Sequence, residues 1–241
     1  VDDFSDLFGM NAAGTDAKMR NTKESILEAQ FTSGAGNWCT WMFGRDLVNW
    51  NNNFTWAKWV TPSRDLISAF KQEGDEVRFK ESIVYYDCNW SNYYPSDNYP
   101  FMYKCRSANS SIIKYRYADV LLLKAEALIM QDTPDLEGAA DIIDEVRDRA
   151  KLGALPTSVR SNKNVLLNAL LKERRLELAF EGQRWFDLVR LDKVEEVMNA
   201  VYSKDSGRKA QIYTFDKNSY RLPIPQSVID ANDKIHQNPG Y

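Results

Sequence analysis

The sequence predicts a mainly α-helical protein with a tetratricopeptide-type helical hairpin, a long helix, a loop-rich aromatic face and a few short strands. Three observations support this prediction. Apolar residues recur at helical spacing through most of the second half of the chain. The first half is instead rich in Trp, Asn and Gly. Hydrophobic residues make up 44% and charged residues 27% of the 241 residues, which is typical of a globular protein.

Residues 63–72 form the clearest helix candidate in the first half. Ser63 fits the N-cap, because its hydroxyl can accept a hydrogen bond from the first turn, and Gly74 fits the C-terminal stop. The following segment, residues 77–86 (VRFKESIVYY), is expected to be a strand. Helical spacing gives residues 63–72 one apolar face, formed by Leu66, Ile67 and Phe70.

Two polar and aromatic segments are expected to be loops. Residues 32–63 contain five tryptophans, three glycines and four asparagines between Asn49 and Asn53. Because Gly and Asn favour turns, this segment is predicted to be a long structured loop region with at most short strands. Residues 89–95 (NWSNYYP) form the second loop.

From Ser111 onward the period is helical and predicts a hairpin of two helices. The second helix is expected to begin with Thr133 as N-cap and Pro134 in the first helical position, and to close at Gly153. Alanines at the facing positions allow the two helices to approach closely. One such unit matches the tetratricopeptide type, although no internal repeat is visible. The two apolar faces comprise Ala118, Leu121, Leu122, Ala125, Leu128 and Ile129, and Ala139, Ile142, Ile143, Val146 and Ala150.

A third, long helix is predicted over residues 162–180, with a boundary at Gly182 because an interior glycine costs about 1 kcal/mol relative to alanine. We expect a single domain over residues 1–241, with a loop-rich, ligand-facing part at 1–110, a helical part at 111–202 and C-terminal strands and tail at 203–241. The last elements expected are a helix at 184–200, paired strands at 212–215 and 220–222, and a helical turn at 227–232.

Composition and charge argue against several classes of protein. The net charge of −3 and the pI of about 5.4 leave no basic surface for nucleic acid, so no nucleic-acid partner is expected. No run approaches the roughly 18 apolar residues that cross a bilayer, and the first residues lack a signal-peptide pattern. The single histidine, His236, leaves little material for a zinc site or a His-activated nucleophile. Cys88 and Cys105 could form a disulfide or stay reduced.

The most enzyme-like feature is the series Glu173, Glu177 and Glu181. Spacing of four residues places neighbouring Cβ atoms roughly 5–6 Å apart, near the carboxylate separation in retaining glycosidases. However, Arg174 and Arg175 lie in the same turns, and cations lower a carboxylate pKa, whereas a general acid needs a raised one. The series is therefore predicted to be a structural ion-pair network, and no catalytic residue is expected.

The aromatic segments give the stronger functional signal. Six of the seven tryptophans lie between Trp38 and Trp90, among many Asn, Ser and Gly residues. Sugar rings dock their apolar C–H faces on aromatic planes, while their hydroxyls bond amide and hydroxyl groups. The alternative is that these rings fill the core beneath a long loop. We expect at least two rings to face a ligand, and the candidates are Trp41, Trp50, Trp56, Trp90, Tyr93 and Tyr94.

Several blocks of the sequence together resemble the C-terminal part of the SusD/RagB family. The strongest runs from Glu173 to Arg190 (ERRLELAFEGQRWFDLVR), and a second covers residues 115–127 (YRYADVLLLKAEA). These blocks lie in the family's order and cover most of the chain. The other blocks lie at residues 23–31, 62–67, 73–75, 222–227 and 237–241.

The SusD/RagB family comprises surface glycan-binding lipoproteins of Bacteroidetes. The resemblance implies a mainly α fold, an outer-membrane, cell-surface location, and capture of oligosaccharide or polysaccharide for a SusC-like TonB-dependent transporter. The family's N-terminal half, with its signal peptide, lipidated cysteine and other helical repeats, is not in this chain, so membrane association would depend on a lipid anchor outside it. No cofactor or metal is expected, and no Asp-rich loop supports calcium.

Two other functions stay open on the sequence. A glycoside hydrolase would need a carboxylate pair in a cleft free of arginines. A helical-repeat module for protein interaction, or a peptide-uptake homologue without glycan binding, would keep its aromatic rings in the core. We expect a binding protein rather than an enzyme.

Overall fold

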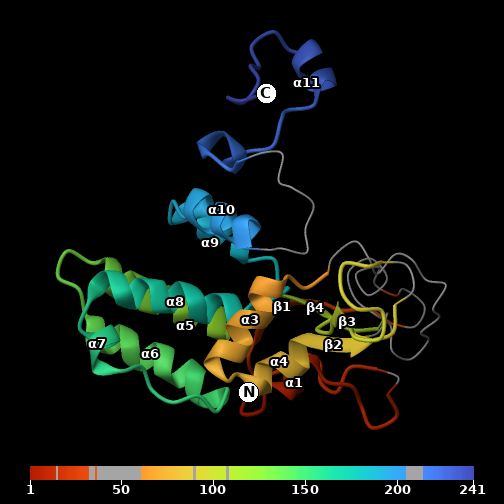
Figure 1. Cartoon of the computed structure of the whole chain (residues 1–241), viewed down its shortest axis with the longest axis vertical. Coiled ribbons are helices and arrows are strands. Elements are labelled where there is room, and N and C mark those ends of the chain that lie inside the picture. Colours follow the sequence, from red (N-terminus) through yellow and green to blue (C-terminus); the bar gives the residue numbers. More distant parts are fainter. Residues whose placement is uncertain (15, 33–35, 37–60, 89–90, 107–108, 205–213) are drawn as a thin grey trace. The chain divides into compact units, whose positions relative to one another are not determined.

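The computed structural model describes residues 1–241 except 15, 33–35, 37–60, 89–90, 107–108 and 205–213. Among the described residues helices dominate and the strands are short, which confirms the predicted fold class (Figure 1). None of the helices described combines the length and hydropathy needed to cross a membrane. Contacts divide the chain into two compact units, Val1–Gln183 and Arg184–Tyr241. The subdivision of one domain at residues 110 and 202 stays a prediction.

Three helices form the core of the first unit: α5 (Tyr117–Met130), α6 (Leu136–Arg149) and α8 (Lys163–Glu177). α5 and α6 form the predicted hairpin, with α8 packed on both (Figure 1). The short α7 (Thr157–Arg160) connects α6 to α8. Small alanines at the seam let the helix axes approach, as expected. The fully buried seam residues are Leu122, Ala125, Ile129, Ala139, Ala140, Ile143, Leu166 and Leu170.

The turn inside the hairpin and the segment before it differ from the prediction. The N-cap of α6 is Asp135, not Thr133, because the Asp135 carboxylate accepts a hydrogen bond from the backbone N–H of Gly138 at 2.9 Å. The helical period predicted from Ser111 is also wrong at its start. Ile112–Arg116 form β4, which pairs antiparallel with β1 (Ser25–Ala29) and gives both backbones their hydrogen bonds before α5 begins.

Helix α3 (Arg64–Glu73) confirms the predicted caps. The Ser63 hydroxyl accepts a hydrogen bond from the N–H of Leu66 at 3.1 Å. Gly74 has φ +67°, in the left-handed region that a residue with a side chain rarely adopts, and its N–H bonds back to the last turn. Both ends of this helix are therefore set by residues next to it in sequence.

Removing the Ser63 cap gives a direct test of this local control. Ser63→Ala is expected to lower the free energy of unfolding by about 1 kcal/mol, because the N–H of Leu66 loses its acceptor. Urea denaturation followed by circular dichroism measures this change. Ser68→Ala, at an exposed position inside the same helix, is the matched control and should cost nothing. Equal losses for the two variants would contradict a capping role.

The predicted strand at residues 77–86 is half wrong. Its first part is helix α4 (Glu76–Ser82), and only Ile83–Tyr86 form a strand, β2. The cause is Asp75, whose carboxylate accepts a hydrogen bond from the N–H of Arg78 at 3.1 Å and starts a new helix directly after Gly74. β2 pairs antiparallel with β3 (Tyr99–Met102). Cys88 and Cys105, which follow β2 and β3 in the chain, are free cysteines and do not form the disulfide that was one of the two possibilities.

The second unit contains α9 (Arg184–Arg190), α10 (Val194–Lys204), a 3₁₀ turn (Lys217–Tyr220) and α11 (Gln226–Asp230). Helix α11 confirms the predicted turn near 227–232. The break predicted at Gly182 does separate α8 from α9, and this glycine has φ +84°. However, α8 ends at Glu177, before the predicted end at residue 180, and Phe180 already has a left-handed backbone with φ +65°.

Two predictions for this unit are wrong. The helix expected over 184–200 breaks at Asp192, which has φ +54°, and the N–H of Lys193 turns back to the carbonyl of Leu188 at 2.8 Å. The strand expected at 220–222 is absent there, because Asp216 caps a 3₁₀ turn that takes in Tyr220. Its expected partner begins at residues 212–213, which lie outside the described residues.

Candidate functional site

The structure describes two of the six residues predicted to face a ligand. Tyr93 and Tyr94 lie in the loop that leads into β3, and both are half-buried. The other four residues lie outside the described part of the chain: Trp41, Trp50, Trp56 and Trp90.

Tyr93 and Tyr94 form the outer end of a row of four aromatic rings. The centroids of Tyr93 and Tyr94 are 5.0 Å apart, and those of Tyr94 and Tyr99 are 5.6 Å apart, both edge to face. Tyr99 and Phe101, with centroids 5.4 Å apart, belong to β3 and are 2% and 1% exposed. The pairing of β2 with β3 thus fixes the inner rings, and the outer rings continue the row to the surface.

Hydrogen bonds hold the two middle rings of the row, Tyr94 and Tyr99, in place. The Tyr94 hydroxyl donates to the carbonyl of Pro62 at 2.7 Å. The Tyr99 hydroxyl lies 3.0 Å from the Thr61 hydroxyl and 3.1 Å from that of Ser91. These contacts tie the loop before β3 to the segment just before α3. A ligand that stacks on rings already held in this way orders fewer side chains on binding.

Arg64, the first residue of α3, lies against both outer tyrosines. Its guanidinium carbon is 4.1 Å from the ring centroid of Tyr93 and 4.4 Å from that of Tyr94, and the group donates a hydrogen bond to the Tyr93 carbonyl. A ligand at these rings therefore meets the guanidinium or uses ring surface that Arg64 leaves open. Nothing in the sequence marks Arg64 as part of this site, because no local pattern links it to a tyrosine 29 residues away.

A shallow hollow of about 450 Å³ opens at this end of the row. Its lining residues are uncharged and combine hydroxyl, amide and ring surfaces. These groups suit a neutral ligand that carries both hydroxyls and apolar faces. The ligand-facing role of Tyr93 and Tyr94 stays a prediction. The hollow is lined by Ser91, Asn92, Tyr93, Tyr94, Pro95 and Ser96.

Glu177, at the end of α8, is the centre of a buried ion-pair network. Its carboxylate lies 2.5 Å from Arg116 of β4 and 3.0 Å from Arg78 of α4, and it also contacts Arg149 of α6. Glu177 and Arg78 are fully buried. Burial alone would raise the pKa of Glu177, but Arg116, Arg149 and Arg78 together hold it well below its usual range.

Glu173 and Glu181 lie near Glu177 along the chain and extend the network. Burial raises the pKa of Glu173, but this carboxylate is 2% exposed and lies 2.5 Å from Arg78, so it has no room for a substrate. The predicted structural network is therefore confirmed. The other contacts join Glu173 to Arg147 at 3.2 Å, and Glu181 to Arg116 at 2.7 Å and Lys104 at 2.6 Å.

The arginines expected to neutralise these glutamates pair elsewhere. Arg174 lies 2.9 Å from Asp119, and Arg175 lies 2.6 Å from Asp65. Consecutive residues of a helix point about 100° apart, so a neighbour in sequence faces a different side. The actual partners come from α4, β4 and α6, up to 99 residues away in the chain.

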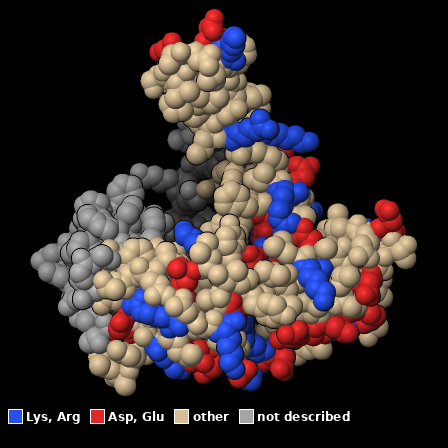
Figure 2. All heavy atoms as spheres, turned by 180° about the vertical axis from the view of Figure 1, so that it is seen from behind, with Lys and Arg blue, Asp and Glu red and all other residues tan. Residues whose placement is uncertain are grey.

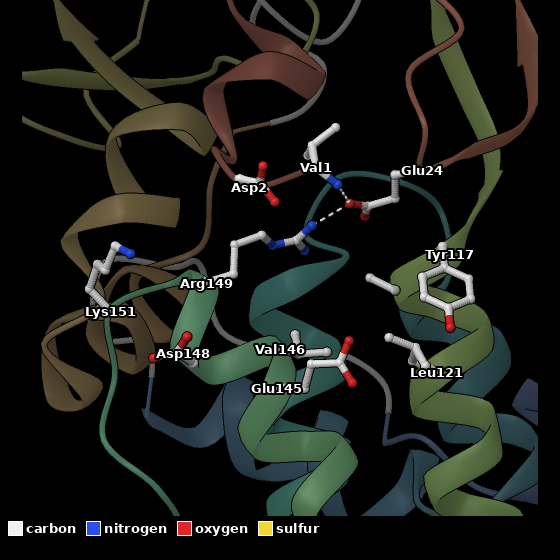
Figure 3. A pocket seen from close by; sticks show the side chains of 11 residues that line it. Val1, Asp2, Glu24, Tyr117, Leu121, Glu145, Val146, Asp148, Arg149 and Lys151 are labelled. Atoms are coloured by element: carbon white, nitrogen blue, oxygen red, sulfur yellow. Dashed lines mark hydrogen bonds and ion pairs between the residues drawn. The ribbon is translucent and has the colours of Figure 1, made fainter.

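A second hollow, of about 340 Å³, opens beside this network (Figure 3). Glu24 and Arg149 face each other at its inner side, while Tyr117 of α5 and Glu145 of α6 lie along its flanks. Its lining is largely charged, which suits a neutral sugar less well than the hollow at the tyrosine row. On the face shown in Figure 2, the described Lys and Arg side chains are interspersed with Asp and Glu rather than gathered into one basic surface.

Comparison with known proteins decides the family. The sequence model described as the SusD family matches residues 99–241, more than half of the chain. The chain belongs to the SusD family. A relative from Formosa agariphila, SusD-like protein P2, is 36% identical over 143 residues, which are 56% of this chain and 27% of that protein. SusD-like protein P38 of the same organism is 43% identical over 99 residues, 39% of this chain and 19% of that protein.

Several solved structures share the fold. A SusD superfamily protein from Parabacteroides distasonis superimposes with a TM-score of 0.73 at 23% identity, over 100% of this chain and 53% of its own. The surface glycan-binding protein A from Bacteroides thetaiotaomicron in complex with laminarihexaose gives 0.72 at 19% identity, over 99% and 55%. A laminarin-binding SusD-like protein gives 0.67 at 24% identity, over 100% and 53%. This SusD-family chain thus spans about half the length of these structures, and its matches cover under a third of the curated relatives.

Proposed function

We propose that this chain is part of a surface glycan-binding protein that captures oligosaccharide or polysaccharide for uptake by a SusC-like TonB-dependent outer-membrane transporter. The observation that carries the proposal is the row of rings that ends at Tyr93 and Tyr94 in an uncharged hollow. A pyranose stacks its C–H face on an outer ring while its hydroxyls bond Ser91 and Asn92. Membership of the SusD family, with solved relatives that include a laminarin-binding protein, supports the same ligand class.

The proposal has two further parts. Trp41, Trp50, Trp56 and Trp90 belong to the same ligand-contacting set, because they lie with Tyr93 in the two segments of the sequence that combine aromatic rings with many Asn, Ser and Gly residues. The protein resides at the cell surface, attached to the outer membrane through a lipid anchor outside this chain. The chain binds its glycan without cleaving it, since Glu173 and Glu177 of α8 are buried and paired with arginines. Release of reducing sugar from a bound glycan would overturn that last point.

Tyr93→Ala tests the proposed platform. The variant is expected to weaken glycan binding roughly 5- to 150-fold, which corresponds to about 1–3 kcal/mol for a lost stacking ring. A glycan array first identifies the ligand, with laminarin included, and affinity electrophoresis then compares the variants. The matched control is Tyr115→Ala, which removes a tyrosine that is 54% exposed on β4, away from the hollow.

Two results would count against this site. Equal affinity for the Tyr93→Ala variant and the wild type would remove Tyr93 from the platform, and the four tryptophans would then be tested in the same way. A properly folded chain that bound no glycan on the array would favour the alternative, a helical module that binds protein or peptide.

A further inference from the structure

A further hollow, of about 410 Å³, opens where α3 ends and α4 begins. Its volume lies within the roughly 300–1,000 Å³ that small-ligand sites occupy. All the residues that line it belong to these two helices and the turn between them, so one short stretch of chain builds it. We call it the α3–α4 hollow, and its lining residues include Phe70, Lys71, Gly74, Glu76, Phe79 and Lys80.

The apolar part of the α3–α4 hollow is the ring of Phe79. Phe79 is half-buried and packs edge to face on Phe70, with the ring centroids 5.7 Å apart, and Phe70 is 1% exposed. A third ring, that of Tyr85 in β2, has its centroid 6.4 Å from that of Phe79. The neighbouring rings therefore hold Phe79 in place while part of its surface faces the hollow. A fixed ring at the surface suits the apolar face of a pyranose.

Gly74 keeps part of the hollow open. This glycine has φ +67°, and the position where a Cβ atom would stand has no other atom within 4 Å. Because Gly74 lines the hollow and carries no side chain, the turn between the two helices leaves room beside its backbone. A ligand can therefore approach the turn without displacing a side chain.

The exposed charge of the α3–α4 hollow is positive. Lys71 and Lys80 both line it and are both exposed, and neither forms an ion pair with any residue that the structure describes. Asp75 is buried and lies 2.5 Å from Arg78, which neutralises it. Glu76 is the remaining acidic side chain of the lining and is exposed. Two unpaired lysines thus face one exposed carboxylate.

A ring surface, open space and two unpaired cations together suit a ligand that has both an apolar face and a negative charge. We propose that the α3–α4 hollow binds an acidic sugar unit, whose C–H face stacks on Phe79 while its carboxylate or sulfate binds Lys71 and Lys80. Glu76 accepts a hydrogen bond from a sugar hydroxyl. This inference rests on the proposed glycan binding and narrows the ligand to glycans that carry acidic units.

The first test removes both charges with the double substitution Lys71→Gln and Lys80→Gln. Isothermal titration calorimetry compares three probes: an oligogalacturonate, a sulfated galacto-oligosaccharide and the neutral galacto-oligosaccharide. The affinity for the acidic probe is expected to fall roughly 3- to 30-fold, because two exposed ion pairs are lost. The affinity for the neutral probe should stay the same. The carboxylated and sulfated probes show which anionic group the lysines bind.

The matched control replaces Lys114 of β4 and Lys124 of α5 with glutamine. Both lysines are exposed and lie outside the hollow, so the control changes the net charge equally. It should bind the acidic probe as the wild type does. The affinity of the wild type for that probe should also fall as the salt concentration rises, and the fall should be smaller for the Lys71 and Lys80 variant.

Gly74→Asn tests the open space without changing the ring or the lysines. Asparagine tolerates a positive φ better than other residues with a side chain, so Tm should change by less than about 4 °C. Its side chain enters the space beside the turn. The variant is therefore expected to bind the acidic probe more than about 5-fold less tightly.

Two results would overturn the inference. One is a wild-type chain that binds neither acidic probe. The other is binding of an acidic probe that neither the lysine variant nor Gly74→Asn weakens. Tyr93→Ala separates this inference from the proposed site: if it alone weakens glycan binding, the tyrosine row stands and the α3–α4 hollow fails. If the lysine variant weakens acidic binding and Tyr93→Ala has no effect, the α3–α4 hollow stands and the tyrosine row fails.

Discussion

Replacing Glu177 with glutamine is expected to lower the free energy of unfolding by about 3–5 kcal/mol. The change keeps the shape of the side chain but removes its charge, so Arg78, Arg116 and Arg149 lose the anion that they share. Arg78 and Arg116 are 0% and 1% exposed, and water cannot take over the role of the carboxylate. Removing one partner from a buried ionic cluster costs more than the cluster contributes as a whole, because the remaining charges stay buried.

Urea denaturation at pH 7 measures this change, and Glu137→Gln is the control. Glu137 also pairs with an arginine, Arg160, but its side chain is 67% exposed, so its loss should cost less than about 1 kcal/mol. Equal losses in the free energy of unfolding for the two variants would contradict a buried network, because water or a rearrangement of the arginines would then replace the Glu177 charge.

The ion-pair network shows which features of a buried cluster can be predicted from the sequence and which cannot. The number and spacing of carboxylates on α8 predict an ionic network, and the structure confirms one. The identity of the partners cannot be predicted, since Arg78 and Glu177 are 99 residues apart and meet only through tertiary packing. Arg174 lies next to Glu173 in the sequence, yet it pairs with Asp119. Helix geometry explains the error, because residues adjacent in sequence lie on different faces.

Helices and strands were predicted correctly where neighbouring residues determine them and incorrectly where tertiary contacts do. Ser63 and Gly74 act on the helix beside them, so both ends of α3 were predictable. Residues 77–82 alternate well enough to suggest a strand, but Asp75 caps a helix there and Arg78 must reach Glu173 and Glu177. A tertiary requirement thus overrides a weak local preference.

In the candidate site, too, residues that only the fold brings together could not be predicted. Composition predicts Tyr93 and Tyr94 as candidates, because loops rich in Asn, Ser and aromatic rings stand out in the sequence. Arg64 gave no such signal, although it contacts both rings. It lies there because α3 begins directly after the Thr61–Pro62 segment, to which hydrogen bonds anchor the tyrosine row.

The ion-pair network and the tyrosine row are connected through one short path in the chain. Arg78 fixes α4 to α8, and α4 runs without a linker into β2. β2 in turn pairs with β3, which carries Tyr99 and Phe101 at the inner end of the row. The buried charges therefore help to hold the strand on which the ring row is built, and losing them should loosen the site as well as the fold.

Raising the pH from 8 to 10.5 is expected to stabilise the chain through Lys104 by about 3 kcal/mol. Lys104 is 5% exposed, and burial lowers its pKa from 10.5 to about 8, although Glu181 at 2.6 Å opposes the shift. Its ammonium group also faces Arg116, the carbonyl of Glu177 and the ring of Phe8. Between these pH values the unfolded chain binds the proton and the folded chain does not, so the free energy of unfolding rises with pH.

Lys104→Met isolates this contribution, because it keeps an unbranched side chain of similar length and removes the ionisable group. The free energy of unfolding of the wild type minus that of the variant should increase by about 1 kcal/mol per pH unit above pH 8. Other groups that titrate in this range cancel in the difference. A flat or falling difference would show that Lys104 keeps its proton in the folded state, held by Glu181. Nuclear magnetic resonance of ¹⁵N-labelled lysine decides the matter on the wild type alone, since a folded-state pKa near 10.5 would exclude the effect.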